Sequence, residues 1–334
     1  MLKHNVDWGV VGASGWAARR FAPAVAAASH ARLTAILSRD IKRAEKLASQ
    51  FANVKAFNSM HEFLDDETVE AVWVASPTFC HAEHSITALR AGKHVLCEKP
   101  MALNSKQCRA MIQSSQTSKR LLGIGYVMRH HPILQTLRET WLRGEFGTPV
   151  TVHARFLYAF QNPPVSWKQM MSTSGGWATN DIATHLIDLV CWLLGQPLEG
   201  YAFRSSPFFH FETDDYLSMI VCFSEGKIAH IESSTGVSPV GPCLELIGSD
   251  GYAILEGTLL GGEGKLITQR RGNPLTTESI SEINLYRLQV EAFSQAIKNG
   301  TSFHPSADDG LATVAIIEQI HVNNRLLPLL FPKE

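Results

Sequence analysis

One segment of the chain reads Ala91-Gly92-Lys93-His94-Val95-Leu96-Cys97-Glu98-Lys99-Pro100-Met101-Ala102-Leu103. It changes from apolar to charged residues near its centre. The apolar run 94–97 has the length of a buried strand, and two opposite charges follow it at Glu98 and Lys99. In an open α/β sheet, ligands bind beyond the carboxyl ends of the strands. A lysine held there among apolar neighbours can exchange protons near neutral pH, so Lys99 is a candidate catalytic residue. The alternative interpretation is an ordinary surface pair between Glu98 and Lys99.

The composition is that of a globular protein without a polyanionic partner. The chain has 334 residues, of which 45% are hydrophobic and 18% charged, and its 30 basic and 31 acidic side chains give a formal net charge of -1. This length allows two domains. The balanced charge provides no overall field to attract nucleic acid or an anionic membrane. We therefore expect a small-molecule partner, with no nucleic acid and no membrane involved.

The sequence shows no pattern of export or membrane insertion. Its first residues pass into a predicted strand without a secretory pattern, and no apolar run approaches the roughly 20 residues of a membrane span. The six cysteines are scattered and form no Cys-x-x-Cys pair. Most of them lie in apolar segments, as buried free thiols do. We expect a cytoplasmic protein.

A glycine-containing turn near the amino terminus is typical of dinucleotide binding. The strand 8–11 runs into Gly12-Ala13-Ser14-Gly15-Trp16-Ala17 and then into an Ala-rich helix that extends to about residue 28. Small residues let the backbone approach a pyrophosphate, and the free N–H groups of the following helix attract the anion. The fingerprint is Gly-x-Gly-x-x-Gly/Ala, with a serine in the second glycine position. The candidate cofactor-binding residues here are Gly12, Ser14, Gly15, Trp16 and Ala17.

The end of the second strand, 33–37, bears on the choice between NAD and NADP. Ser38 stands where an acidic residue would bind the ribose hydroxyls of NAD. A hydroxyl and a guanidinium suit the 2′-phosphate of NADP, so we favour NADP, with Ser38 and Arg39 at the phosphate and Arg43 as a second cation. NAD stays possible if Asp40 merely caps the helix 42–51 and Arg39 is solvated.

Strands and helices continue to alternate as far as residue 126. The further expected elements are strands 54–57, 69–75 and 121–126 and helices 60–64, 81–91 and 105–118. This alternation implies right-handed crossovers and a doubly wound parallel sheet. Ser76 and Pro77 follow the strand 69–75, where a rigid turn can pack beneath a nicotinamide ring. With Glu98 and Lys99 they complete the expected cofactor-binding set.

Two histidines on the helix 81–91 raise the question of a metal site. His81 and His84, with Glu83 between them, are possible ligands, but no third ligand clusters with them in the sequence. We therefore expect no metal.

Beyond residue 126 the chain becomes rich in closely spaced strand-forming segments. After a helix at 132–142, the expected strands are 150–160, 217–223, 227–233, 244–247, 252–255 and 265–268. Few helices separate them, which favours an α+β domain with a mostly antiparallel sheet. Two late helices, 285–299 and 307–323, complete the chain. We expect a nucleotide-binding domain at 1–125 and a substrate-binding domain at 126–334.

A second chemically informative segment begins with the turn Gly175-Gly176. After it, Asp181, His185 and Asp188 share one face of a predicted amphipathic helix. A carboxylate one turn before an imidazole can orient the ring and stabilise its protonated form, as acid–base catalysis requires. The alternative is a surface Asp–His pair with only a salt-bridge role. The two glycines argue against this alternative, because they leave room for a ligand near the first turn.

Together these segments resemble the family named for glucose–fructose oxidoreductase, inositol dehydrogenase and the rhizopine-catabolism protein (Gfo/Idh/MocA). The resemblance covers most of the chain, with Ser14 and Ala183 in two positions where the family usually has glycine. It implies an N-terminal Rossmann domain and a C-terminal α+β domain whose large, mostly antiparallel open sheet commonly mediates homo-oligomerisation. It also implies a catalytic group formed by Lys99, Asp181 and His185. The Lys99-Pro100 bond is expected to be cis, which would aim the lysine into a cleft.

The resulting hypothesis is an NAD(P)-dependent oxidoreductase that acts on a secondary alcohol or ketone of a sugar or sugar-like polyol. His185 would transfer the hydroxyl proton, Lys99 would hydrogen-bond the same oxygen, and Asp181 would hold the substrate or the imidazole. Weaker candidates for the substrate wall are Tyr126, Arg129, Trp167 and Lys168, although packing suits the two aromatic residues equally well. Two alternatives stay open: a nucleotide-binding regulator without turnover, and an enzyme that acts on a non-sugar such as a dihydrodiol or a biliverdin-like carbonyl.

Overall fold

The computed structural model describes residues 5–161, 163, 165–237, 240–323 and 325–326, and it divides the chain into two compact units. The first unit comprises Met1–Tyr126 and Asn284–Leu311, and the second comprises Val127–Ile283 and Ala312–Glu334. The expected domains, 1–125 and 126–334, therefore differ from these units chiefly in the segment Asn284–Leu311.

That segment belongs with the first unit because its helix packs into the first unit's core. Helix α9 (Leu285–Asn299) buries Val290 and Phe293 in this core, beside Trp8 of the first strand. The indole N–H of Trp8 donates a hydrogen bond to Ser294 Oγ at 3.0 Å. Contacts between such distant parts of the chain cannot be recognised from hydrophobic periodicity, so the sequence pattern misassigned α9.

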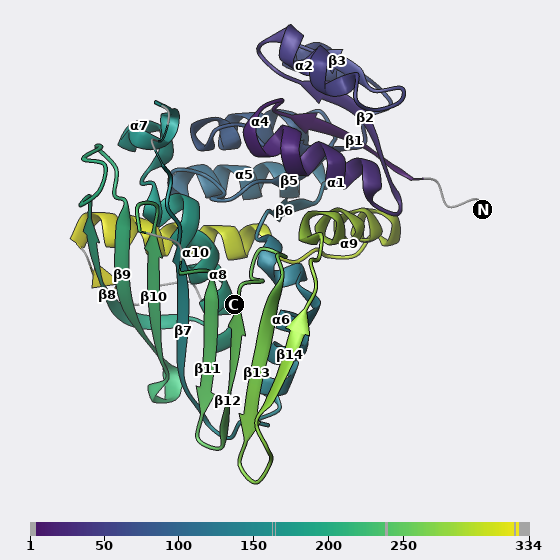
Figure 1. Cartoon of the computed structure of the whole chain (residues 1–334). Coiled ribbons are helices and arrows are strands. Elements are labelled where there is room, and N and C mark those ends of the chain that lie inside the picture. Colours follow the sequence, from purple (N-terminus) through teal and green to yellow (C-terminus); the bar gives the residue numbers. More distant parts are fainter. Residues whose placement is uncertain (1–4, 162, 164, 238–239, 324, 327–334) are drawn as a thin grey trace. The chain divides into compact units, whose positions relative to one another are not determined.

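The first unit is built on a parallel sheet of six strands in the described part of the chain (Figure 1). In spatial order these strands are β3 (Lys55–Phe57), β2 (Ala31–Leu37), β1 (Val6–Val11), β4 (Ala71–Val74), β5 (His94–Cys97) and β6 (Leu122–Ile124). All residues of β1 and β4 are buried, as expected for strands covered on both faces. The predicted doubly wound sheet is confirmed. The strand order reverses between β1 and β4, which is where sheets of this type bind ligands.

The helices of the first unit follow the predicted alternation. They are the π-helix η1 (Ala17–Phe21), which continues into α1 (Ala22–Ala27), then α2 (Ile41–Ala48), α3 (Met60–Asp65), α4 (Thr78–Arg90) and α5 (Ser105–Ser118). Asn104 caps α5 by accepting a hydrogen bond from the backbone N–H of Gln107. Helix α4 begins three residues earlier than expected, directly after Pro77, which fits proline's suitability for the start of a helix.

The second unit contains a larger sheet, with nine strands among the described residues. In spatial order they are β14 (Thr276–Ile280), β13 (Gly264–Arg270), β12 (Gly251–Glu256), β11 (Cys243–Gly248), β7 (Pro149–Leu157), β10 (Ile228–Ser234), β9 (Tyr216–Phe223), β8 (Pro197–Ser205) and β15 (Arg325–Leu326). The pairing is antiparallel except between β7 and β10, which confirms a mostly antiparallel sheet. The sequence pattern missed β8, β14 and β15. Strand β8 includes Pro197 and Gly200, and β14 is almost entirely exposed, so neither shows the usual hydrophobic signal.

Helices cover one face of this sheet. The core joins α6 (Pro132–Leu142), α8 (Thr184–Leu194) and the later turns of α10 (Ala307–Asn323) to inward-facing side chains of the strands. The other face is open in Figure 1 and exposes Tyr201, Phe203 and Ile220. The shorter helical segments are η2 (Val127–His130), η3 (Trp167–Gln169), α7 (Met171–Ser174), η4 (Ala178–Ala183) and η5 (Ser224–Gly226). Within the described ranges, no helix combines the length and apolar character needed to cross a membrane.

Candidate active site

The glycine turn after β1 fits a dinucleotide pyrophosphate. Gly12 has φ +128°, and a side-chain Cβ there would lie 2.9 Å from the carbonyl oxygen of Ala75, so only glycine suits this position. Its N–H donates to Leu37 O at 2.8 Å, which ties the turn to the end of β2. Ser14, Gly15 and Trp16 are exposed, whereas Ala17 is buried beneath them. The turn therefore offers small, accessible residues at the switch between β1 and β4.

Two arginines that were not among the predicted site residues lie beside this turn. The guanidinium carbons of Arg19 and Arg20 lie 5.7 and 5.6 Å from the centre of the Trp16 ring, which is 45% exposed. Arg19 also donates to the carbonyl oxygen of Gly15 at 3.3 Å. Two cations next to the exposed turn favour an anionic ligand.

Of the residues after β2, Asp40 caps the next helix and Arg39 is exposed to solvent. Asp40 caps α2 by accepting a hydrogen bond from the N–H of Lys42 at 3.1 Å, and the Arg43 Nε atom lies 3.1 Å from the same carboxylate. Arg43 is therefore already paired within the chain. Arg39 is exposed at the strand end, next to the half-buried Ser38.

Arg39 is also close enough to influence the first turns of α4. Burial lowers the pKa of His84, Glu83 opposes this effect, and the charge of Arg39 adds to it. The end of β2 and the start of α4 therefore belong to one electrostatic neighbourhood.

The segment after β4 is held by two histidines of α4. His81 Nε2 lies 2.8 Å from the carbonyl oxygen of Ser76, and His84 Nδ1 lies 3.0 Å from the Ser76 hydroxyl. The other ring nitrogen of His81 lies 2.9 Å from the carbonyl oxygen of Pro100. The Ser76–Pro77 segment and Pro100, which directly follows Glu98–Lys99, are thus both tied to α4. No cluster of three or more His, Cys, Asp or Glu side chains suited to a metal ion occurs in the described part of the chain.

The residues after β5 differ in exposure. Glu98 is buried, and its Oε1 accepts a hydrogen bond from the Trp73 indole N–H at 3.1 Å. Lys99 is half-buried at the carboxyl end of the strand. The Lys99-Pro100 bond is cis, as expected. Glu98 therefore has a structural partner beneath the strand end, while Lys99 stands at the edge where ligands bind.

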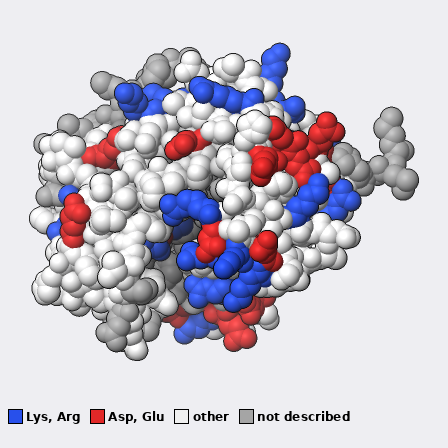
Figure 2. All heavy atoms as spheres, turned by 90° about the horizontal axis from the view of Figure 1, so that it is seen from above, with Lys and Arg blue, Asp and Glu red and all other residues white. Residues whose placement is uncertain are grey.

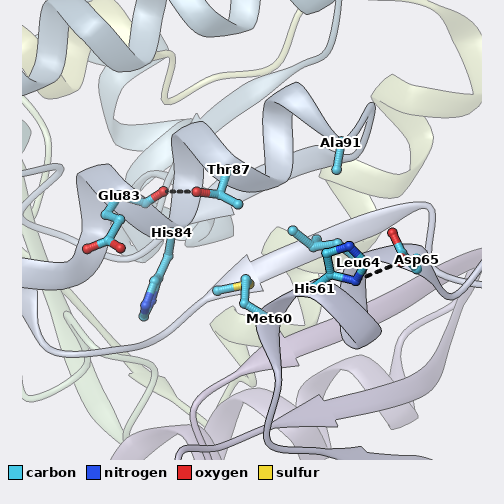
Figure 3. A pocket seen from close by; sticks show the side chains of 8 residues that line it. All are labelled: Met60, His61, Leu64, Asp65, Glu83, His84, Thr87 and Ala91. Atoms are coloured by element: carbon cyan, nitrogen blue, oxygen red, sulfur yellow. Dashed lines mark hydrogen bonds and ion pairs between the residues drawn. The ribbon is translucent and has the colours of Figure 1, made fainter.

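A cavity of about 440 Å³ lies between α3 and α4 in the first unit (Figure 3). Its lining residues are Met60, His61, Leu64, Asp65, Glu83, His84, Thr87 and Ala91. His61 and Asp65 form an ion pair at 2.8 Å on the α3 side. His84 extends from α4 toward Met60, and because it also contacts Ser76, it links this cavity to the segment after β4.

In the second unit, Asp214 shapes the turn that precedes the candidate acid–base helix. Gly176 has φ +131°, and a Cβ there would lie 2.8 Å from Asp214 Oδ1. The Asp214 carboxylate accepts a hydrogen bond from the Thr179 hydroxyl, and its carbonyl oxygen accepts from the N–H of Ala178 at 3.0 Å. Burial raises the pKa of Asp214, and the hydrogen bond from Thr179 opposes the rise. The di-glycine turn thus accommodates this buried carboxylate, which the sequence analysis missed because Asp214 stands far along the chain.

Asp181 lies in the π-helix η4 and forms an ion pair with Lys168. The side chains of Lys168 and Asp181 are 21% and 26% exposed, so the pair is accessible but partly shielded. The carbonyl oxygen of Lys168 accepts hydrogen bonds from the Ser174 and Thr213 hydroxyls at 3.0 and 3.1 Å. These contacts hold Lys168 and the neighbouring, half-buried Trp167 against α7. The wide turn of a π-helix is common at functional sites.

His185 is buried rather than on the surface, with 6% of its area exposed. One turn further along α8, Asp188 is 2% exposed and accepts two hydrogen bonds from Arg129: Nη2 to Oδ1 at 2.5 Å and Nε to Oδ2 at 2.9 Å. Of the Asp181–His185 pair, His185 is therefore interior, whereas Asp181 is partly exposed and pairs with Lys168. Arg129, which was expected at the substrate wall, instead forms a buried ion pair with Asp188. Tyr126 is also fully buried.

The parallel sheet with its glycine turn is that of a nucleotide-binding domain, and comparison with known families gives the enzyme class. Residues 6–126 match the family model described as an oxidoreductase family with an NAD-binding Rossmann fold. Residues 134–254 match the model of the GFO/IDH/MocA C-terminal domain. The chain belongs to the Gfo/Idh/MocA family. The predicted family, fold class and enzyme class are confirmed.

Similar proteins resemble almost the whole chain. The 1,5-anhydro-D-fructose reductase of Ensifer adhaerens is 27% identical, covering 92% of this chain and 93% of the relative. The D-xylose 1-dehydrogenase (NADP(+)) 2 of Haloferax volcanii is 25% identical, covering 94% and 96%. The crystal structure of aldose-aldose oxidoreductase from Caulobacter crescentus, complexed with glycerol, has a TM-score of 0.88 at 24% identity, covering 95% and 97%. This last likeness supports the fold.

Proposed function

We propose that this NAD(P)-binding oxidoreductase interconverts a secondary alcohol and a ketone on a sugar or sugar-like polyol. The observation that supports this proposal most directly is the position of Lys99. Its ammonium group follows the carboxyl end of β5, in the same unit as the glycine turn. The names of the two relatives, an anhydrofructose reductase and a xylose dehydrogenase, support a sugar as the substrate class.

In the proposed reaction each residue has a separate task. When bound, the nicotinamide supplies the hydride chemistry. His185 accepts the hydroxyl proton during oxidation and returns it during reduction, while Lys99 donates a hydrogen bond to the same oxygen. Asp181, charge-balanced by Lys168, accepts hydrogen bonds from the substrate. This proposal requires the first unit, as the nucleotide-binding domain, and the second, as the substrate-binding domain, to act on one bound substrate.

We further propose that NADP is the preferred cofactor. Ser38 replaces the acidic residue that would favour NAD, and Arg39 is an exposed cation directly after it. The xylose dehydrogenase relative is named as an NADP(+) enzyme. NAD remains the alternative, because Asp40 caps α2 and pairs with Arg43, so Arg43 contributes less free charge than the sequence alone suggested.

Two further expectations concern the protein's surroundings. The exposed apolar side chains Tyr201, Phe203 and Ile220 on the open sheet face support a homo-oligomer formed through that sheet. Light scattering of the wild type and the Phe203→Asp variant checks this. A charge on the apolar sheet face should dissociate the oligomer, so the variant should have a lower molar mass than the wild type. All six cysteines are free thiols, which supports the expected reducing, cytoplasmic compartment.

A substrate screen with an active-site control tests the function. NADPH absorbance is followed with aldoses, anhydro-sugars, inositols and their ketones, for the wild type and for Lys99→Ala. The wild type should turn over at least one sugar, and Lys99→Ala should lose about 100-fold or more in kcat while still binding NADPH. Lys106→Ala, an exposed lysine on α5, serves as the control. Tight NADPH binding without turnover of any sugar would favour a regulator, and turnover of dihydrodiols alone would favour a non-sugar enzyme.

A further inference from the structure

The buried imidazole of His81 contacts two separate segments of the first unit. The ring is 2% exposed, and each of its two nitrogens faces a backbone carbonyl oxygen: Ser76 O at 2.8 Å and Pro100 O at 2.9 Å. We propose that His81 is a positioning residue that sets the Lys99-Pro100 segment relative to the Ser76–Pro77 segment. The inference rests on the proposed function, in which these segments hold the catalytic amine and the cofactor.

The topology explains why one ring can reach both segments. Strands β4 and β5 are paired neighbours, and their carboxyl ends carry Ser76 and Pro100 respectively. Helix α4 begins directly after Pro77, so His81 lies in its second turn, beside both strand ends. The imidazole thus bridges the two segments through the backbone carbonyl oxygens of Ser76 and Pro100. A shift of about 1 Å in such a support can cost roughly 100-fold in rate.

The protonation of the ring makes its two contacts unequal. The pKa of His81 is lowered to about 4, chiefly by burial; the contacts with the carbonyl oxygens of Pro100 and Ser76 oppose this, and the charges of His84 and Lys99 add to it. The ring is therefore neutral at neutral pH, and a neutral imidazole has one N–H donor. Only one of the two carbonyl oxygens can accept its hydrogen, so the two contacts can be separated by mutation.

Two amide substitutions remove one contact each. The Asn amide nitrogen falls near the position of imidazole Nδ1, and the Gln amide nitrogen near that of Nε2. His81→Gln places a donor toward Ser76 and removes the ring nitrogen that faces Pro100, so kcat should fall roughly 10- to 100-fold with little change in NADPH affinity. His81→Asn places a donor toward Pro100 and removes the ring nitrogen that faces Ser76, so NADPH affinity should weaken more than kcat. Lys106→Ala, the exposed control on α5, should leave both kcat and NADPH affinity unchanged.

This division between kcat and cofactor affinity is not expected of a merely structural histidine. If both His81 variants lose kcat and affinity in proportion to their loss of Tm, or if both behave as wild type, the inference is overturned. If neither variant folds, 15N NMR of the wild-type ring decides: a positioning role requires the His81 ring nitrogen shifts to change when NADPH binds, and unchanged shifts overturn the inference. Failure of the function itself is recognised separately, by a wild type without sugar turnover or a Lys99→Ala variant with full activity.

Discussion

Lys168 and Asp181 form an ion pair in the second unit, and each is about three-quarters shielded from solvent. Lys168 stands in the short helix η3, whereas Asp181 lies in the π-helix η4 beyond the di-glycine turn. The pair thus joins two segments that the sequence analysis treated as separate. It also changes the expected role of Lys168, from a residue of the substrate wall to the counter-charge of a candidate catalytic carboxylate.

Replacing Lys168 by methionine should impair substrate handling without affecting the cofactor. Lys168→Met removes the counter-charge and frees the Asp181 side chain to change rotamer, so kcat/KM for the sugar should fall roughly 10- to 100-fold. NADPH affinity should not change, because the glycine turn lies in the other unit. Lys168→Arg keeps the charge and should retain most of the activity. Steady-state kinetics of both variants check this, and an unaffected Lys168→Met enzyme would exclude Lys168 from the site.

The two arginines after β2 should contribute unequally to NADP preference. Arg39→Ala removes an exposed cation, so the KM for NADPH should rise roughly 10- to 100-fold, the scale of one or two charge-assisted hydrogen bonds. The KM for NADH should change little, because NADH has no 2′-phosphate. Arg43→Ala is the matched control: Arg43 is already paired with Asp40, so its effect should be smaller. Equal effects on both cofactors would contradict the assignment of Arg39.

The elements of the first unit were predictable because each depends on local patterns. The apolar runs before Gly12, Ser38 and Glu98 are buried strands, and Asp40 and Asn104 cap their helices as their side-chain chemistry suggests. The nucleotide turn was recognisable for the same reason, since its glycine requirement arises within a few residues. The exception is α9 in the distant segment Asn284–Leu311, which was expected in the second domain but packs in the first unit.

The second unit was less predictable because its key contacts join distant residues. Nothing in the sequence around Arg129 indicates that it will pair with Asp188, and nothing around Asp214 indicates that it will support the turn at Gly176. The helix α8 also looked amphipathic because Asp188 is charged, although its partner allows it to be buried. Such long-range polar pairs determine which charged residues are interior, and a single sequence does not reveal them.

The protein should lose stability when the pH falls below neutrality. Burial is the main cause that lowers the pKa of each of five histidines to about 4: His81, His94, His130, His131 and His321. Their usual value in an unfolded chain is about 6.5, so the unfolded state binds more protons between pH 6.5 and 4. Stability from these neutral rings is therefore fully present above pH 6.5 and is lost as the pH falls toward 4.

Thermal unfolding at several pH values measures this loss. The Tm of the cofactor-free protein should fall by about 5 °C or more between pH 7 and pH 5. The carboxylates with lowered pKa, such as Asp66 and Glu145, remain charged in this interval, so they should not contribute. A Tm that stays constant down to pH 5 would show that these rings are not buried in the neutral form.

The last prediction separates the two roles suggested for Arg129. If the buried pair with Asp188 is structural, Arg129→Met leaves an uncompensated carboxylate in the core and should cost about 3–5 kcal/mol of stability. The double variant Arg129→Met with Asp188→Leu removes both charges and should recover much of that loss, because apolar residues can replace a buried ion pair at little cost. Thermal or urea unfolding of the wild type, the single variants Arg129→Met and Asp188→Leu, and the double variant gives the coupling between the two positions. If Arg129→Met instead keeps the wild-type Tm and raises only the KM for the sugar, Arg129 belongs to the substrate wall after all.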